Sequence, residues 1–219
     1  MRVLVIGGTR FIGVYLTKQL VEQDHQVTLL NRGNQPAPVD GVETILCDRT
    51  DPTALQKALS DQSFDAIFDN NGRELENTQP LAELFKGKLK HFIYVSSAGV
   101  YAKRDQMPHV EGDPVDPNSR HKGKFHTEDY LKEQGLPFTA IRPVYLEDFD
   151  FGKKKAFPMR VQHFFTDISK AKTELDWQPQ FSLIAGLKDA FENDYLANDR
   201  HKGEVDFSLD DHILSQMTA

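Results

Sequence analysis

A buried strand that runs directly into a glycine-rich turn and then into an amphipathic helix is the feature that most constrains this chain. The apolar run Val3–Ile6 is typical of a strand with both faces covered, and glycines follow at once over Gly7–Gly13. Apolar residues at helical spacing then occupy Phe11–Glu22, and a second apolar strand is expected over Val27–Leu30. The beginning of the chain therefore predicts a strand, helix, strand unit, which requires parallel strands.

The same alternation continues along the chain. Further strands are expected at 42–46, 66–68, 92–95 and 138–141, and further helices at 52–59, 75–85 and 125–133. Asp51 is the type of residue that caps a helix beginning at residue 52. Six strands alternating with helices predict an α/β fold with a doubly wound, mostly parallel sheet of the Rossmann type. We expect this domain to cover residues 1–145, and residues 146–219 to form a truncated C-terminal region with closing helices and an acidic tail.

Composition and charge narrow the class of protein. No apolar run approaches the length of a membrane span, and the single cysteine, Cys47, excludes a disulfide within the chain. Because no signal or transit segment is recognisable before the first strand, we expect a soluble cytoplasmic protein. The net charge of −7 at pH 7 opposes a general nucleic-acid surface. This acidity is concentrated, since residues 192–219 hold seven acidic side chains against two basic ones.

The position of the glycine-rich turn gives it a chemical meaning. Glycines allow a tight turn and close packing of the helix on the strand, and the helix begins with unpaired N–H groups at the positive end of its dipole. This arrangement suits the pyrophosphate of a dinucleotide. A turn that packs a helix and binds nothing is the alternative, so the chain is expected to bind a dinucleotide or no cofactor at all. The expected cofactor-binding residues are Gly7, Gly8, Thr9, Arg10, Phe11, Ile12, Gly13, Asn31, Arg32 and Asp48.

Two arginines modify this expectation. Arg10 stands where such turns usually carry their middle glycine, so that it either clamps the pyrophosphate or narrows the site. After the second strand, an NAD-binding domain usually places a carboxylate against the ribose, whereas this chain has Asn31 and Arg32. Because an arginine suits a 2′-phosphate, NADP is favoured over NAD if a cofactor binds.

The segment Tyr94–Tyr101 resembles the extended short-chain dehydrogenase/reductases, the NAD-dependent epimerase and dehydratase superfamily. In that family the serine that matches Ser97 hydrogen-bonds the substrate, and a Tyr-x-x-x-Lys pair on the next helix performs acid–base catalysis. The lysine of this pair matches Lys124. The tyrosine has no match, because Arg120 stands four positions before that lysine.

The loss of this tyrosine is chemically serious. A phenol beside a lysine can pass a proton at neutral pH, whereas an arginine keeps its proton throughout this range. In the family the aromatic residue equivalent to Tyr101 packs rather than reacts, so we do not expect it to act as a substitute. Redox catalysis is therefore expected to be lost, with Ser97 and Lys124 as its remnants. For Ser97, a hydroxyl satisfied by nearby backbone is an equally weighted alternative.

A second stretch, near the C-terminus, resembles the same superfamily. Asp167–Lys172, followed by Leu175 and Trp177, is similar to its closing-helix motif. The resemblance implies a packing role, so we expect Leu175 and Trp177 to be core residues. Closing helices are expected over 169–177 and 183–196.

Further motifs resemble a narrower branch, the chloroplast stem-loop-binding proteins and their cyanobacterial relatives. These motifs are the glycine-rich turn with its arginine, Asn31–Gly33, Asn71–Glu74, Ser119–Lys124 and Phe149–Pro158. Plant members of this branch bind stem-loop RNA and ribosomal particles, and endoribonuclease activity is attributed to some. After Tyr145 the family continues through a further strand and most of a substrate-covering domain, which this chain lacks. A natural deletion, a gene-model error and engineering all explain this absence. Strand six should then lie at an exposed edge unless residues 161–165 cover it.

Three functions follow, in order of preference. RNA-associated binding ranks first because basic residues cluster inside the motifs of the narrower branch, and the partner would be structured RNA or a ribonucleoprotein. An NADP-dependent epimerase, dehydratase or reductase acting on a nucleotide sugar or another small molecule ranks second, and an inert scaffold third. No metal site is expected, since the histidines among the lysines lack suitably spaced cysteine or carboxylate partners. No membrane partner is expected either, and the oligomeric state stays open.

The basic residues indicate where RNA would bind. They follow strands five and six, so we expect them at the carboxyl edge of the sheet, where ligands bind in doubly wound folds. Lys86, Lys88 and Lys90 precede strand five and should lie at the opposite edge. The expected RNA-binding residues are Lys122, Lys124, Lys153, Lys154 and Lys155.

Overall fold

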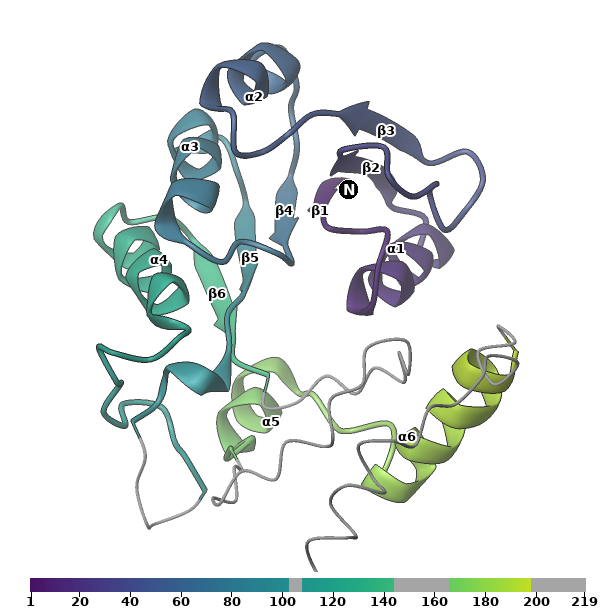
Figure 1. Cartoon of the computed structure of the whole chain (residues 1–219), viewed down its shortest axis with the longest axis vertical. Coiled ribbons are helices and arrows are strands. Elements are labelled where there is room, and N and C mark those ends of the chain that lie inside the picture. Colours follow the sequence, from purple (N-terminus) through teal and green to yellow (C-terminus); the bar gives the residue numbers. More distant parts are fainter. Residues whose placement is uncertain (103–107, 144–165, 198–219) are drawn as a thin grey trace, which may run out of the picture. The chain divides into compact units, whose positions relative to one another are not determined.

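The structure of the chain, a computed structural model, describes residues 1–102, 108–143 and 166–197. It separates into two compact units, Met1–Leu146 and Glu147–Ala219. The first unit contains the glycine-rich turn and one six-stranded sheet, shown in Figure 1. The predicted fold class, α/β with a doubly wound parallel sheet, is confirmed.

All neighbouring strands of the sheet are parallel. They are β1 (Arg2–Ile6), β2 (Gln26–Asn31), β3 (Glu43–Leu46), β4 (Ala66–Asp69), β5 (His91–Val95) and β6 (Phe138–Ile141). Their order is β3-β2-β1-β4-β5-β6, so the chain builds outward from β1 in one direction and then in the other. The order reverses between β1 and β4, where Ile6 pairs with Asp69. In doubly wound sheets, ligands bind outside this switch point.

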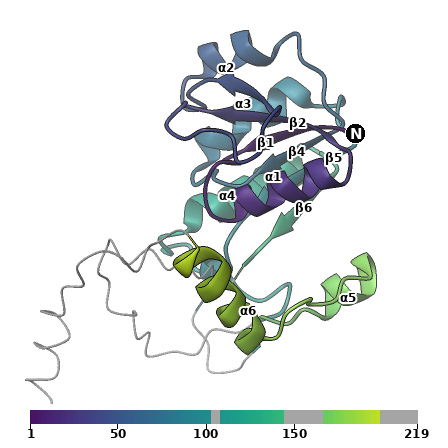
Figure 2. The ribbon, with the colours of Figure 1, turned by 90° about the vertical axis from the view of Figure 1, so that its right-hand side faces the viewer.

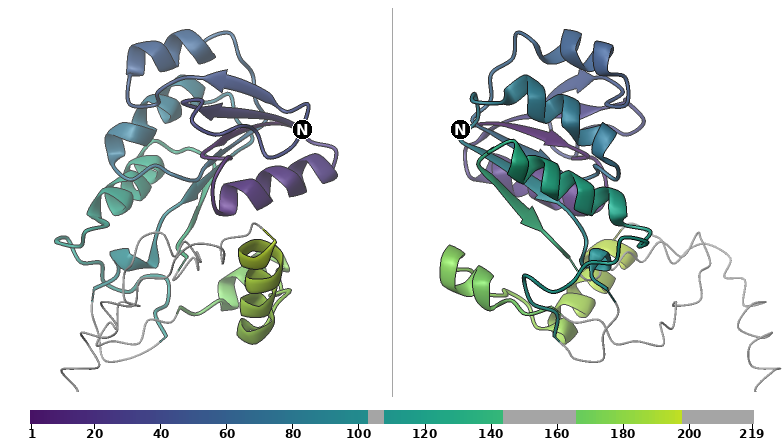
Figure 3. Two further views of the ribbon diagram at one scale, coloured as in Figure 1. Left: turned by 45° about the vertical axis from the view of Figure 1, so that its right-hand side comes forward. Right: turned by 90° about the vertical axis from the view of Figure 1, so that its left-hand side faces the viewer.

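Helices cover both faces of the sheet. Helix α1 (Ile12–Glu22) lies on one face, and α2 (Pro52–Leu59), α3 (Leu75–Phe85) and α4 (Lys122–Glu133) lie on the other (Figure 2, Figure 3). This division follows from right-handed crossovers, because the chain moves one way from β1 to β2 and the opposite way from β3 to β4, β5 and β6. The larger core under α2, α3 and α4 includes Phe92, Tyr94 and Leu131. The smaller core under α1 is built from Val3, Val5, Leu20, Val27 and Leu29.

Local signals explain where the helices begin. Asp51 caps α2 as predicted, since its Oδ1 accepts hydrogen bonds from the N–H groups of Thr53 and Ala54, both at 3.0 Å. The start of α4 at Lys122 lies earlier than the predicted start at residue 125. The first turn of this helix is polar and basic, so the apolar pattern could not indicate it.

The second unit contributes two described helices and a π-helical turn. They are α5 (Ser169–Leu175), α6 (Leu183–Ala190) and η2 (Phe191–Leu196). The prediction that Leu175 and Trp177 are core residues is wrong, since their exposed fractions are 65% and 45%. Among the residues of 166–197 whose burial is described, none is buried.

Strand β6 is an edge strand of the sheet, and its last residue, Ile141, is exposed. Residues 161–165, which were expected to cover this edge, lie outside the described residues. In the parts of the chain that the structure describes, no helix is long and apolar enough to cross a membrane.

Candidate functional site

The glycine-rich turn between β1 and α1 is closely packed. Gly7 has a φ of +80°, a conformation that favours glycine. A Cβ at Gly13 would lie 2.0 Å from the carbonyl oxygen of Gly7 and 2.8 Å from the Cα of Gly8, so only glycine fits at this position. The Thr17 hydroxyl fastens the turn to the helix, because the carbonyl oxygens of Gly13 and Gly8 accept from it at 2.7 and 3.2 Å.

Arg10 and Phe11 form the exposed part of the turn. The left-handed backbone conformation falls on Phe11, with a φ of +50°, and not on Arg10. The ring of Phe11 is 56% exposed. No side chain caps the N-terminus of α1, where the N–H groups of Gly13 and Val14 donate to the carbonyls of Arg10 and Phe11 at 3.0 and 3.1 Å. The positive end of the helix dipole lies at this turn and favours an anionic ligand. A non-glycine residue held at positive φ costs free energy and is often found in ligand-binding loops.

The end of β2 carries the residues expected beside the ribose. Asn31 Oδ1 accepts a hydrogen bond from the N–H of Gly33 at 2.7 Å, and Asn31 Nδ2 is buried without a partner among the described residues. Asp48, after β3, accepts from the backbone N–H and the hydroxyl of Thr50, at 2.9 and 2.7 Å. These bonds, and to a smaller extent the cation of the exposed Arg32, hold the pKa of the Asp48 carboxyl below its ordinary value.

Buried polar groups without partners gather at the carboxyl ends of the strands. Within the described residues they include Asn31 Nδ2 after β2, both amide atoms of Asn70 after β4 and the hydroxyl of Ser96 after β5. A buried polar group without a hydrogen bond costs free energy. These groups fit a polar ligand such as a nicotinamide dinucleotide at the switch point of the sheet.

A buried ion pair lies at the same edge. Asp69, the last residue of β4, is 0% exposed, and Arg49, between β3 and α2, is 8% exposed. The guanidinium donates to both carboxylate oxygens of Asp69, at 2.5 and 2.7 Å, and to the amide oxygen of Asn71 at 2.8 Å. Burial opposes the charge of Asp69, but Arg49 together with the hydrogen bonds from Thr78 and Gly72 outweighs burial and lowers the pKa of this carboxyl.

Gly72 connects this ion pair to Lys124. Its N–H donates to Asp69 Oδ1 at 3.0 Å, and its carbonyl accepts from the Lys124 ammonium at 3.1 Å and from the Tyr94 hydroxyl at 2.9 Å. Lys124 also donates to the carbonyl of Val95 at 2.6 Å. Burial lowers the pKa of Lys124 to about 8, although Asp69 acts in the opposite direction. The lysine is therefore held between the ends of β4 and β5.

The serine and arginine of the dehydrogenase-like motif make local contacts. Ser97 Oγ accepts from the N–H of Gly99 at 3.1 Å, within the 3-10 turn η1 (Ala98–Val100). Arg120 is exposed, and its Nε donates to His121 Nε2 at 3.0 Å. The His121 ring packs on Gly99, where a Cβ would lie 2.4 Å from the ring. A guanidinium has no acceptor atom, so Arg120 has no means of relaying a proton.

Two tyrosines near this motif are held in packed positions. Tyr101 is 6% exposed and stacks on His109, with ring centroids 4.8 Å apart. The guanidinium of Arg142 lies 4.8 Å from the Tyr101 ring centroid and is paired with Glu128. Tyr94 is buried in the core, and burial raises the pKa of its hydroxyl. Neither side chain is placed to exchange protons with a ligand.

Two of the five lysines expected to contact RNA lie in the described residues. Lys122 is exposed in the first turn of α4, which contains no acidic residue. Lys124 is half-buried, and its ammonium is engaged by backbone carbonyls. The remaining three, Lys153, Lys154 and Lys155, lie outside the described residues.

The other basic cluster, Lys86, Lys88 and Lys90, directly precedes β5 and therefore lies at the amino edge of the sheet, as predicted. Lys90 pairs with Asp65 at 2.8 Å. Lys86 donates to the side-chain oxygen of Gln134 at 2.9 Å.

Sequence reasoning missed Arg49 and Asp69 as members of the site. Asp69 ends a strand whose other residues are apolar, and a carboxylate at that point of a buried sheet requires a partner. That requirement is the signal that could have found the pair, although it does not say which arginine supplies the partner.

The sequence also did not reveal that two motifs of the narrower branch meet. The motif Asn71–Glu74 lies against Ser119–Lys124, because a Cβ at Gly123 would lie 2.0 Å from a carboxylate oxygen of Glu74. The close approach explains why a glycine is needed within the first turn of α4.

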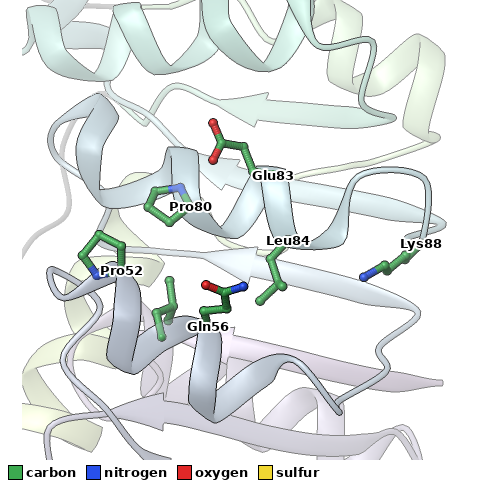
Figure 4. A pocket seen from close by; sticks show the side chains of 7 residues that line it. Pro52, Gln56, Pro80, Glu83, Leu84 and Lys88 are labelled. Carbon is green, nitrogen blue, oxygen red and sulfur yellow. The ribbon is translucent and has the colours of Figure 1, made fainter.

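A separate groove of about 400 Å³ lies between α2 and α3 (Figure 4). Pro52 and Gln56 line it from α2, Pro80 and Leu84 from α3, and Lys88 from the segment after α3. None of its lining residues belongs to the glycine-rich turn or to the contacts of the lysine on α4. Within 1–102, 108–143 and 166–197, no group of three or more His, Cys, Asp or Glu side chains is arranged to hold a metal ion.

Comparison with known proteins shows what the chain resembles. A family model described as NAD(P)H-binding matches residues 7–173. The chain is 34% identical to the chloroplast stem-loop binding protein of 41 kDa b from Arabidopsis thaliana, over 98% of the chain and 84% of that protein. This alignment runs over 321 positions against 219 residues, so at least 102 positions have no counterpart in the chain. About a third of the aligned length of the relative is therefore missing from the chain.

Epimerases are similar over a shorter region. UDP-glucose 4-epimerase from Lactobacillus helveticus is 25% identical over 65% of the chain and 51% of its own length. The structure of UDP-glucose 4-epimerase from Thermotoga maritima with UDP-glucose has a TM-score of 0.56 and 22% identity, over 65% of the chain and 55% of that structure. The enzyme from Thermus thermophilus in complex with NAD has a TM-score of 0.56 and 21% identity, with 65% and 54% covered. The chain thus spans about half the length of these epimerases and shares their fold.

Proposed function

This chain belongs to the NAD(P)H-binding family of epimerase and dehydratase type, together with the chloroplast stem-loop binding protein, and on that premise we propose that it binds structured RNA. The observation that carries the proposal is the 34% identity with a protein named for stem-loop binding, over 98% of the chain. The nicotinamide-dinucleotide scaffold would then serve as a second ligand site without redox turnover.

The exposed cations at the carboxyl edge of the sheet support this function. Arg120 and Lys122 are exposed where α4 begins, and Arg73, after β4, is a third exposed cation. Arg73 is close enough to Lys124 to lower the pKa of that lysine. RNA phosphate groups bind to such clusters through charge and release counterions, and this binding depends little on the nucleotide sequence.

Binding of a short stem-loop RNA at two salt concentrations tests the proposal. Affinity should fall steeply as salt rises. Arg120→Glu combined with Lys122→Glu should weaken binding at least about tenfold at low salt and reduce the salt slope by roughly 0.7 to 0.9 for each phosphate that is no longer neutralised. Charge reversal of Lys153, Lys154 and Lys155 together should also weaken binding.

Lys86→Glu combined with Lys88→Glu is the matched control, because it makes the same change of charge at the amino edge of the sheet. This variant should bind RNA with much less loss. Equal losses in the two double variants would contradict the proposed surface, and a wild-type chain that does not retain the RNA at low salt would contradict the function.

For the dinucleotide, we propose that NADP binds in preference to NAD. Arg32 is exposed beside Asp48, and the neighbouring residue is Asn31 rather than a carboxylate. One charge-assisted hydrogen bond to the 2′-phosphate corresponds to roughly tenfold tighter binding. Calorimetry should therefore show this preference in the wild type and its loss in Arg32→Gln. The same affinity for both nucleotides would remove Arg32 from this role.

An epimerase, dehydratase or reductase is the second candidate, favoured by Lys124 at the carboxyl edge of the sheet. We expect no turnover of UDP-glucose or UDP-galactose with either nicotinamide dinucleotide, because Arg120 cannot pass a proton. An absorbance assay at the nicotinamide band and product analysis by chromatography provide the measurement. Hydride transfer that disappears in Lys124→Ala would restore the enzyme function.

A further inference from the structure

The buried pair Arg49–Asp69 and the ammonium of Lys124 both bind Gly72, the pair through its N–H and the ammonium through its carbonyl. We propose that this pair positions Lys124, by holding Gly72 so that the ammonium is fixed between the carbonyls of Gly72 and Val95 and keeps one N–H for an oxygen of a bound ligand. The identity of that ligand rests on the dinucleotide site proposed above. The positioning does not depend on it.

The peptide of Gly72 is firmly held against the ion pair. Its N–H donates to Asp69 Oδ1 at 3.0 Å, and a Cβ on Gly72 would lie 2.4 Å from Thr78 Oγ and 2.8 Å from Asp69 Oδ2. Thr78 Oγ itself donates to Asp69 Oδ2 at 2.7 Å. The Asp69 carboxylate thus holds the loop after β4 in place through these hydrogen bonds.

Arg49 links the Asp69 carboxylate to the loop after β3 and to α3. It follows Asp48 in the loop after β3, and its Nε donates to the carbonyl of Asn77 in α3 at 3.1 Å. Its bidentate contact with Asp69 sets one orientation, because a guanidinium and a carboxylate match in a plane. The loop that carries Asp48 and the lysine are therefore connected through hydrogen bonds of Arg49, Asp69 and Gly72.

Lys124 is placed to respond to this pair. An ammonium has three donors, and the carbonyls of Gly72 and Val95 take two of them. The charged groups that act on it are Asp69 from β4, Arg49, Arg73 after β4 and Glu128 on its own helix, and the Tyr94 ring lies 5.4 Å away. Burial lowers the pKa of Lys124 to about 8, Asp69 and Glu128 raise it, and the two arginines lower it further.

Competitive labelling with acetic anhydride, read by mass spectrometry of the full chain across neutral and alkaline pH, measures the pKa of Lys124 without any ligand. Asp69→Asn keeps an oxygen for the N–H of Gly72 but removes the charge that raises this pKa. The pKa of Lys124 should therefore fall below that of the wild type, and a fall of about one unit increases labelling at pH 7 roughly fivefold.

A role limited to packing predicts the opposite result for Asp69→Asn. A loosened site would hydrate the ammonium and raise the pKa of Lys124 toward the ordinary value of 10.5. An unchanged or raised pKa overturns the proposal. Asp65→Asn is the matched control, since it makes the same substitution directly before β4, where Asp65 pairs with Lys90, and should leave Lys124 labelling unchanged.

A measurement on the wild type keeps the proposal testable if Asp69→Asn does not fold. The amide resonance of Gly72 should titrate with the same midpoint as the labelling of Lys124, near pH 8, because this residue binds the carboxylate through its N–H and the lysine through its carbonyl. A Gly72 amide that does not titrate there overturns the positioning. Added NADP should protect Lys124 from labelling. A lack of protection would contradict the assignment of the dinucleotide as the ligand. It would not affect the positioning of Lys124, which is measured without NADP.

Discussion

Gly13 and Arg10 show that two positions of one turn carry different constraints. Gly13 has no room for a side chain, because its Cα faces the carbonyl of Gly7. Arg10, at the position of the middle glycine, is exposed, and the positive φ values of the turn fall on Gly7 and Phe11. The fold therefore requires the last glycine whether or not a ligand binds, whereas the middle position is free to change with the ligand.

Replacing Gly13 tests this difference. Gly13→Ala should lower the free energy of unfolding by about 1 to 3 kcal/mol, because the added methyl group overpacks the contact between β1 and α1. Urea denaturation followed by circular dichroism measures this change. Arg10→Gly in the same turn should change the free energy of unfolding by less than about 1 kcal/mol. Equal losses of unfolding free energy in the two variants would show that crowding at Gly13 is not the cause of the destabilisation.

Among the elements, β4, α3 and the loop after β3 are joined by the pair of Arg49 and Asp69. Removing one partner leaves the other charge buried, which typically costs about 3 to 5 kcal/mol. We therefore expect severe destabilisation in Asp69→Leu and in Arg49→Met. The double variant should lose less free energy of unfolding than the sum of the two single losses, because it leaves no unpaired charge in the core. Chemical denaturation of all four proteins measures the coupling, and additive losses would contradict it.

The elements also show how far sequence patterns reach. The alternation of apolar strands with helices predicted all six strands of the described sheet and their parallel arrangement. The reason is clearest for the central strands β1 and β2, which are buried and therefore need continuous apolar residues. The glycine-rich turn was likewise recognised from its place between a strand and a helix. The ion pair was not, since Arg49 and Asp69 are distant in sequence and no period relates them. The exposure of Leu175 and Trp177 was missed because residue type does not reveal whether a covering surface exists.

At the scale of the whole molecule, charge is distributed unevenly. The net charge is −7, and residues 198–219, beyond the described helices, hold five acidic side chains against two basic ones. Such a segment repels phosphates, so it opposes RNA binding away from a basic surface. This repulsion is a long-range effect and should depend on ionic strength.

Neutralising acidic residues of this segment tests its effect on RNA binding. Asp206→Asn, Asp210→Asn and Asp211→Asn together should increase RNA affinity severalfold at low salt, and the gain should shrink as salt is added. Fluorescence anisotropy of a labelled stem-loop provides the measurement.

The matched control replaces Asp24, Asp40 and Asp61, which are exposed and precede strands at the amino edge of the sheet. The same change of charge there should have a smaller effect. A gain of equal size in both triple variants would show that net charge alone, and not its position, governs binding.

The hydrogen bonds of Lys124 affect how a lysine at this position should be interpreted. A lysine kept only for acid–base chemistry would drift once its tyrosine partner was replaced, because selection would no longer act on it. Here its loss would deprive the carbonyls of Gly72 and Val95 of a donor inside the protein, so these contacts give a structural reason for the lysine that does not depend on acid–base chemistry. A lysine at this position is therefore not by itself evidence of the reaction, and the residue four positions before it, Arg120 here, is the more informative one.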